Sequence, residues 1–109
     1  MREVVFDTET TGLSAANGDR LVEIGCVELV NRVETGRVFH VYINPERPMN
    51  PEAQAIHGLS DAFLADKPVF SRIVSGFLDF IGNDRLVIHN AAFDLRMLNA
   101  ELTRLGKPT

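Results

Sequence analysis

The sequence predicts an α/β fold with elements in the order β-β-β-α-α-β-α. Segments rich in branched apolar residues fill the chain before residue 44, prolines interrupt it there, and helical stripes follow on either side of one more apolar run. Such changes of hydrophobic period are the primary signal of secondary structure. The 109 residues, of which 45% are hydrophobic, can bury one core, so we expect one domain.

Three apolar segments near the N-terminus predict the first strands. Residues 4–6 form a short continuous apolar run, which is typical of a strand buried on both faces. Residues 20–30 are rich in valine, leucine and isoleucine, and apolar side chains alternate within residues 37–43. Because Thr35-Gly36 is a turn-type dipeptide, we expect a hairpin there and a three-stranded antiparallel meander.

Capping residues and apolar spacing predict the helices. Asn50 is a favoured N-cap residue and Gly58 a favoured helix stop, so a helix of about two turns is expected between them. Apolar residues within 70–81 recur every three or four positions and predict a longer helix. The apolar run 86–88 predicts a fourth strand, and the leucines within 95–105 predict the last helix.

Composition and charge exclude several classes of protein. The single cysteine, Cys26, can form neither an internal disulfide nor a zinc site of several thiolates, so we expect a cytoplasmic protein whose metal sites use oxygen ligands. No apolar stretch approaches the roughly 18 residues of a membrane span, and no membrane partner is expected. A net charge of -4 argues against binding nucleic acid through a broad basic face, because counterion release needs clustered Lys and Arg.

Carboxylates stand at the ends of two predicted strands. Asp7 and Glu9 lie two residues apart, so both point to one face of an extended strand, where a hard cation such as Mg²⁺ or Mn²⁺ would relieve their repulsion. A solvated loop start or a helix cap is the alternative for this pair. Thr10 can contact a phosphate or sugar, or serve only the turn. Asp94 is either an ordinary helix-start acid or a third member of the site, because ligands of open sheets bind where neighbouring parallel strands end.

The histidines differ in their contexts. His40 lies on the polar side of an alternating segment, and we expect it at the surface of a strand. His89 ends the fourth apolar run and is expected to orient Asn90 or a backbone group. His57 lies in the last turn of the short predicted helix, where it is either a substrate contact or a structural residue.

Three motifs in register resemble the DEDD exonucleases, and among them the proofreading subunits of bacterial replicative DNA polymerases. The motifs are DTETTGL at 7–13, PEA with IHGL at 51–59, and HNAAFD at 89–94. The resemblance extends over residues 3–105 and implies a ribonuclease H-like fold with flanking helices and a mixed sheet, in which the fourth strand runs parallel to the first. It also implies hydrolysis of the 3′-terminal phosphodiester of DNA by two divalent ions, Mg²⁺ or Mn²⁺.

The resemblance assigns roles residue by residue. Asp7, Glu9 and Asp94 are implied to be catalytic residues and metal ligands that also face the substrate. Contacts with the terminal nucleotide are implied for Glu52 and His57 and, more weakly, for Thr10 and Phe93, while His89 and Asn90 would support the site. The implied partners are DNA 3′ ends and the catalytic subunit of the replicative polymerase.

The chain departs from the family pattern because it ends before the third motif. We therefore expect residues 1–109 to be the N-terminal part of one exonuclease domain, without the fifth strand, the fourth carboxylate and the histidine general base, and nearly inactive alone. Two alternatives stay open: an exonuclease of the same superfamily that trims RNA ends, and a non-catalytic module that binds nucleic acid or a polymerase. A loose likeness of DTET to the aspartyl-phosphate phosphatases is disfavoured, because a helix rather than a hairpin should then follow.

Overall fold

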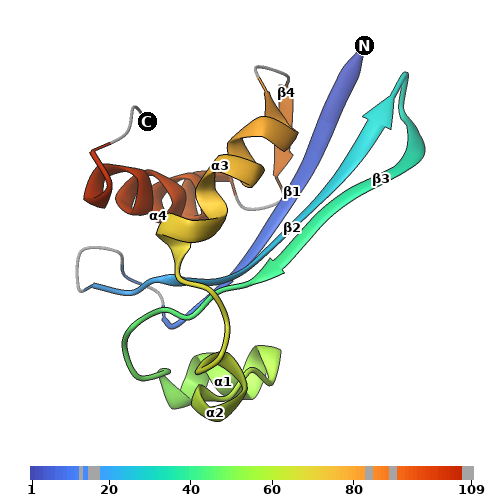
Figure 1. The fold of residues 1–109 in the computed structure, drawn as a ribbon. Helices are drawn as coiled ribbons and strands as arrows, with labels where there is room; N and C mark the ends of the chain where they lie inside the picture. The colour runs from blue at the N-terminus through green and yellow to red at the C-terminus, as the bar shows by residue number, and fades with distance from the viewer. Residues whose placement is uncertain (13, 15–17, 83–84, 89–90, 107–109) are drawn as a thin grey trace.

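The fold is one four-stranded sheet with helices against one face and beyond one end (Figure 1). The computed structural model describes residues 1–12, 14, 18–82, 85–88 and 91–106. The strands are β1 Arg2–Thr10, β2 Leu21–Val30, β3 Val33–Tyr42 and β4 Arg85–Ile88. The helices are α1 Pro51–His57, α2 Asp61–Leu64, α3 Phe70–Ile81 and α4 Ala91–Arg104.

The strand order β3-β2-β1-β4 confirms the predicted mixed sheet. β1 pairs antiparallel with β2, with Asp7 opposite Gly25, and parallel with β4, with Phe6 opposite Ile88. β2 and β3 complete the antiparallel meander. The carboxyl ends of β1 and β4 therefore lie at the same end of the sheet, as the sequence predicts.

The hairpin between β2 and β3 turns earlier than predicted. Asn31 and Arg32 form the turn with φ values of 51° and 68°, whereas Gly36 lies inside β3 with a φ of 91°. Left-handed conformations at both turn residues match the right-handed twist of a two-residue hairpin, and asparagine tolerates this conformation well. The expectation of a turn at Thr35-Gly36 is therefore wrong by about four residues.

Two further boundaries differ from the prediction. β1 does not end before the acids but continues to Thr10, and Val5 is half-buried, so only one face of β1 is fully covered. A short helix that the sequence did not predict, α2, lies between α1 and α3, and its N-cap Ser60 accepts a hydrogen bond of 3.1 Å from the Phe63 amide. A four-residue helix is too short to show a hydrophobic period, so spacing could not predict it.

The main core lies between the sheet and the pair α3 and α4. The Phe77 ring of α3 is fully buried, with ring centroids 5.6 Å from Phe6 on β1 and 6.0 Å from Phe39 on β3. The predicted apolar stripe of α3 is thus confirmed. In α4, however, the prediction is only partly right, because Leu95 and Leu105 are exposed.

The end of the sheet away from the N-terminus carries α1 and α2 (Figure 1). Asn50 caps α1 by accepting a hydrogen bond of 2.8 Å from the Glu52 amide, and Gly58 ends it with a φ of 74°, as predicted. α1 contains no fully buried residue. A small second core of Val22, Met49 and Leu64 holds this region.

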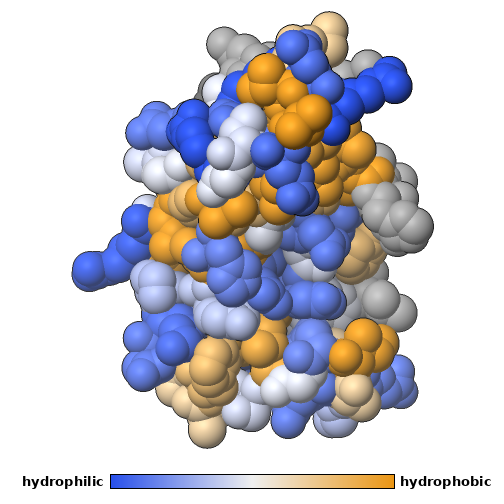
Figure 2. Space-filling model, turned by 90° about the vertical axis from the view of Figure 1, so that its right-hand side faces the viewer, coloured by the Kyte–Doolittle hydropathy of each residue, from blue (hydrophilic) through white to orange (hydrophobic). Residues whose placement is uncertain are grey.

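The outer strand β3 leaves apolar side chains at the surface. Val33 and Val38 are 67% and 62% exposed, and Figure 2 shows apolar residues in patches among hydrophilic ones on this side of the molecule. His40 is exposed too, as predicted, and pairs with Glu23. Within the residues that the structure describes, no helix is long and apolar enough to cross a membrane.

Candidate active site

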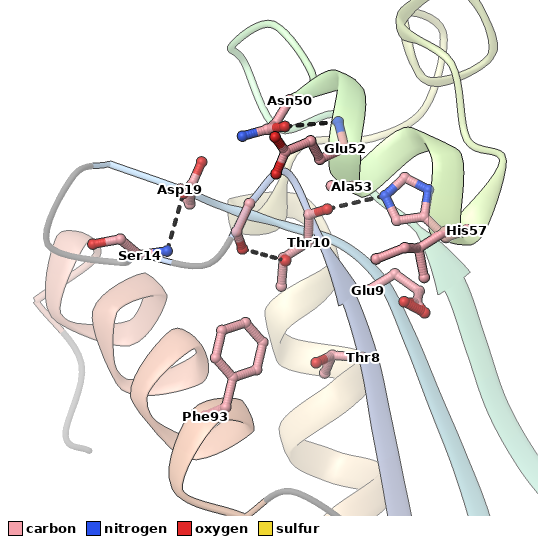
Figure 3. A pocket seen from close by; sticks show the side chains of 12 residues that line it. Thr8, Glu9, Thr10, Ser14, Asp19, Asn50, Glu52, Ala53, His57 and Phe93 are labelled. Carbon is pink, nitrogen blue, oxygen red and sulfur yellow. Dashed lines mark hydrogen bonds between the residues drawn. The ribbon is translucent and has the colours of Figure 1, made fainter.

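A cavity of about 390 Å³ opens at the end of β1, between α1 and α4 (Figure 3). It brings together five residues that the resemblance places at the site: Glu9, Thr10, Glu52, His57 and Phe93. β1 supplies the first two, α1 the next two, and α4 supplies Phe93 on the opposite wall. Residues more than 80 positions apart in the sequence therefore line one pocket.

The alternation of β1 separates its polar side chains onto two faces. Thr8 and Thr10 are buried on the face that carries the core, whereas Asp7 is exposed and Glu9 half-buried on the other face. The Thr8 hydroxyl donates a hydrogen bond of 2.6 Å to Asp94, which lies in the first turn of α4 and is only 4% exposed. Asp94 is therefore held on the side of the strand to which Thr8 points.

The surroundings of Glu9 raise the pKa of its carboxyl group. Burial raises its pKa above the ordinary value, and the negative charges of Asp7, Glu23 and Asp94 raise it further, while a positive charge on His57 would oppose them. Both other predicted ligands thus act electrostatically on Glu9. A bound cation would relieve this repulsion.

The donor set has the chemistry of a site for a hard divalent cation, because Asp7, Glu9 and Asp94 offer only carboxylate oxygens. The positions of these three side chains do not form a complete metal site. Within the described residues, no three His, Cys, Asp or Glu side chains are grouped so that they could hold a metal ion. The Thr8 hydroxyl donates to one oxygen of Asp94, Oδ1, and a carboxylate that accepts one hydrogen bond keeps further lone pairs for a cation. The predicted metal cluster therefore stays a prediction.

His57 is fixed by hydrogen bonds at both ring nitrogens. Its Nδ1 accepts from the Leu59 amide at 3.0 Å, and its Nε2 lies 3.0 Å from the Thr10 carbonyl oxygen, which can only accept (Figure 3). These partners fit a neutral ring with its proton on Nε2. His57 thereby ties the end of α1 to the end of β1, and its predicted contact with a nucleotide remains a prediction.

A loop residue that the sequence did not single out also lines the pocket. Asp19 accepts hydrogen bonds from the Thr11 hydroxyl at 2.8 Å and from the Ser14 amide at 3.0 Å. A Cβ added to Gly12 would lie 2.5 Å from an Asp19 oxygen, so a larger residue there would displace the Asp19 carboxylate. No motif distinguishes Asp19 from a solvated loop acid. By contrast Asn50, which also lines the pocket, was visible as a helix cap.

Two predicted supporting residues, His89 and Asn90, lie outside the described residues. Of their neighbours in the chain, β4 ends at Ile88 opposite Phe6, and α4 carries the pocket residue Phe93. The expectation that they support the site stays a prediction.

Comparison with known proteins identifies relatives over almost the whole chain. A protein-family model described as Exonuclease (RNase_T) matches residues 4–109. DNA polymerase III subunit epsilon of Rickettsia conorii is 57% identical over 107 residues, which cover 98% of this chain and 46% of that protein. The Escherichia coli K12 protein of the same name is 47% identical over 110 residues, covering 97% and 45%. The chain thus spans less than half the length of these relatives.

Solved structures share the fold. Exonuclease X in complex with 5′ overhanging duplex DNA has a TM-score of 0.74 at 32% identity, over 87% of this chain and 52% of that one. A product-bound exonuclease I has a TM-score of 0.82 at 18% identity, over 94% and 25%. At that identity the likeness shows the ribonuclease H-like fold alone. Because the family match covers nearly every residue that builds the sheet and the pocket, the chain belongs to the exonuclease family.

Proposed function

We propose that this chain supplies the N-terminal part of a 3′–5′ DNA exonuclease domain that proofreads during DNA replication in the cytoplasm. The observation that carries the proposal is the pocket in which Glu9, Glu52, His57 and Phe93 meet at the end of β1. The relatives named DNA polymerase III subunit epsilon support a DNA 3′ end as substrate and the polymerase catalytic subunit as partner.

The size and lining of the pocket suit one terminal nucleotide. About 390 Å³ lies within the range of small-ligand sites. Phe93 on α4 and the apolar residues Ala53 and Ile56 on α1 line the pocket, so an unpaired base could be held between apolar side chains of the two helices. Glu52 and the Thr10 hydroxyl lie at the same wall, where sugar hydroxyls could be bound.

The acidic side chains of the pocket mean that a polyanion could bind there only together with cations. The described residues that line it include Glu9, Asp19 and Glu52 but neither Lys nor Arg. Asp19 is offset by Arg47, 3.7 Å away, but phosphate would be repelled by the carboxylates of Glu9 and Glu52 unless cations intervened. When bound, two divalent ions such as Mg²⁺ or Mn²⁺ supply an activated water and stabilise the charge that develops during in-line displacement.

The residues of the chain have distinct tasks in this scheme. Asp7, Glu9 and Asp94 would hold the ions, and Thr8 keeps Asp94 beside β1 through its hydroxyl. His57 holds the α1 wall against the end of β1 through the Thr10 carbonyl. The third motif of the family, with its general base and fourth carboxylate, would come from the part of the domain that follows this segment.

A chimera tests the proposal. This chain would replace the matching 107 residues of the Rickettsia conorii relative, and release of the last nucleotide from a 3′-labelled DNA strand would be measured. We expect release with Mg²⁺ and none with a chelator. Because two ion ligands are at stake, Asp7→Asn and Asp94→Asn should each lower the rate at least about 100-fold.

The matched control is Glu34→Gln, which removes an exposed carboxylate on β3 far along the hairpin and should leave the rate unchanged. A folded chimera that releases no nucleotide, while the unaltered relative does, would contradict the proposal. A labelled RNA strand run in parallel shows whether RNA ends are the preferred substrate instead.

A further inference from the structure

α4 carries a second buried acid that the proposed site does not use. Glu101 is 1% exposed and lies seven residues after Asp94, so the two acids lie about 10 Å apart on the same side of the helix. Met97 and Leu98 are buried between them. An acid in the middle of an apolar stripe requires specific partners, because an unpaired buried charge is costly.

Arg20 is the main partner of Glu101. Its guanidinium donates hydrogen bonds of 2.9 Å and 2.6 Å to the carboxylate, and the Leu21 amide donates another of 3.0 Å. Arg104, one turn further along α4, lies 3.6 Å from the same carboxylate. Glu101 therefore fastens α4 to the start of β2, just as Asp94 fastens it to β1 through Thr8.

The backbone of Arg20 continues this connection toward the other wall of the pocket. Arg20 and Thr11 exchange two hydrogen bonds, from the Thr11 amide to the Arg20 carbonyl at 2.9 Å and from the Arg20 amide to the Thr11 hydroxyl at 3.0 Å. The Thr11 carbonyl accepts from the Asn50 amide at 3.0 Å, and the Asn50 side chain caps the helix that bears Glu52. Thr11 is fully buried.

We propose that Glu101 and Arg20 are positioning residues, which set the distance between the α4 wall and the α1 wall of the pocket and so orient a bound 3′ end. Buried Met97, Leu98 and Leu102 pack α4 into the core, and the bonds at Asp94 and Glu101 add directional restraints that apolar packing lacks. Without the Glu101–Arg20 pair, only the Asp94–Thr8 bond of these two restraints would remain, and the Arg20 side chain would no longer be held beside Thr11. The expected effect on kcat rests on the proposed exonuclease function, whereas the expected effect on the positions of the two pocket walls does not.

The test compares two buried acids in the chimera. Glu101→Gln should lower kcat at least tenfold and shift the amide NMR signals of Thr8, Thr11 and Glu52. Glu28→Gln is the matched control, since Glu28 is also buried and also bonded to arginines, Arg2 and Arg37, but lies outside the pocket. It should lower the melting temperature comparably while changing kcat less than twofold.

Arg20→Lys provides a milder variant in case Glu101→Gln does not fold. It keeps the charge but not the planar fork, so an intermediate loss of kcat and smaller shifts of the same signals are expected. Equal kcat losses in Glu101→Gln and Glu28→Gln, or unmoved signals of Thr8 and Glu52, would overturn the inference. If the chimera shows no turnover, the proposed function fails, and the NMR signals still decide the positioning role.

Discussion

The hydrogen bond between Thr8 and Asp94 offers a direct test of how the site is built. Thr8→Val keeps the branched shape at a residue that is 8% exposed but removes the hydroxyl that donates to the Asp94 carboxylate at 2.6 Å. Hydrogen bonds to charged groups contribute about 1.5–3 kcal/mol, so the free energy of unfolding should fall by about 2 kcal/mol. For 109 residues this corresponds to a melting temperature lower by about 9 °C.

Thr10→Val is the matched comparison, because Thr10 lies two residues along the same strand and is similarly buried. Its hydroxyl also donates a bond of 2.6 Å, but to the neutral carbonyl of Gly12. That bond should contribute only about 1 kcal/mol. Urea denaturation of both variants, with the slope checked for constancy, measures the difference. If Thr8→Val costs no more than Thr10→Val, Asp94 does not depend on Thr8 as an ionised acceptor.

Three further predictions concern parts of the fold outside the site. Burial raises the pKa of the Cys26 thiol to about 12. At about pH 8 a thiol reagent should therefore label Cys26 far more slowly in the folded chain than in the urea-unfolded chain. Equal labelling rates would show that Cys26 is accessible in the folded chain. Gly76→Ala should raise the free energy of unfolding by about 0.5–1 kcal/mol in urea denaturation, because the added Cβ meets only Phe39, at 3.6 Å. The hydrogen bond from Arg2 lowers the pKa of Glu28 in the folded chain. The stability that ionised Glu28 contributes is therefore fully present above its unfolded pKa of about 4.3 and is lost as the pH falls through its lower folded pKa. Glu28→Gln lacks this contribution, so its melting temperature should fall less steeply in acid than that of the parent chain.

Helices with strong local signals could be predicted closely from the sequence. The stripe of α3 recurs over the whole element, and its four buried residues, Phe70, Val74, Phe77 and Ile81, follow the helical period. α1 has no such stripe, yet Asn50 and Gly58 mark its ends because capping depends on residues adjacent in the chain. Local chemistry was therefore sufficient for both helices.

Elements that depend on distant contacts were harder to predict. The hairpin turn lies at Asn31-Arg32 because the β2–β3 register, with Val30 opposite Val33, determines where the chain reverses. Thr35, which the dipeptide pattern assigned to the turn, instead donates a hydrogen bond to Glu28 across the strands. Neither the register nor this cross-strand bond can be read from a single segment.

The sequence predicted which residues belong to the site better than it predicted how they are arranged. The resemblance named five residues that do line the pocket, Glu9, Thr10, Glu52, His57 and Phe93. It did not name Asp19, and it gave no sign that Asp94 would be bonded to Thr8 rather than grouped with Asp7. Motifs report which residue types occur together, whereas the hydrogen-bond partner of each side chain depends on the packing of α4 against β1.

The hydrogen-bond and ion-pair partners of the carboxylates distinguish the structural ones, Glu28 and Glu101, from the candidate catalytic residue Glu9. Glu28 and Glu101 are each bonded to arginine and belong to the framework of the sheet and α4. Glu9 is half-buried and, within the described residues, accepts no hydrogen bond and forms no ion pair, while burial and neighbouring carboxylates raise its pKa. A carboxylate kept in such a place costs stability in the absence of a ligand, and groups with this property cluster at functional sites. Among the described residues, the Glu9 carboxylate thus stays without a counter-charge while the framework carboxylates are neutralised, which fits the proposed binding of cations at the pocket.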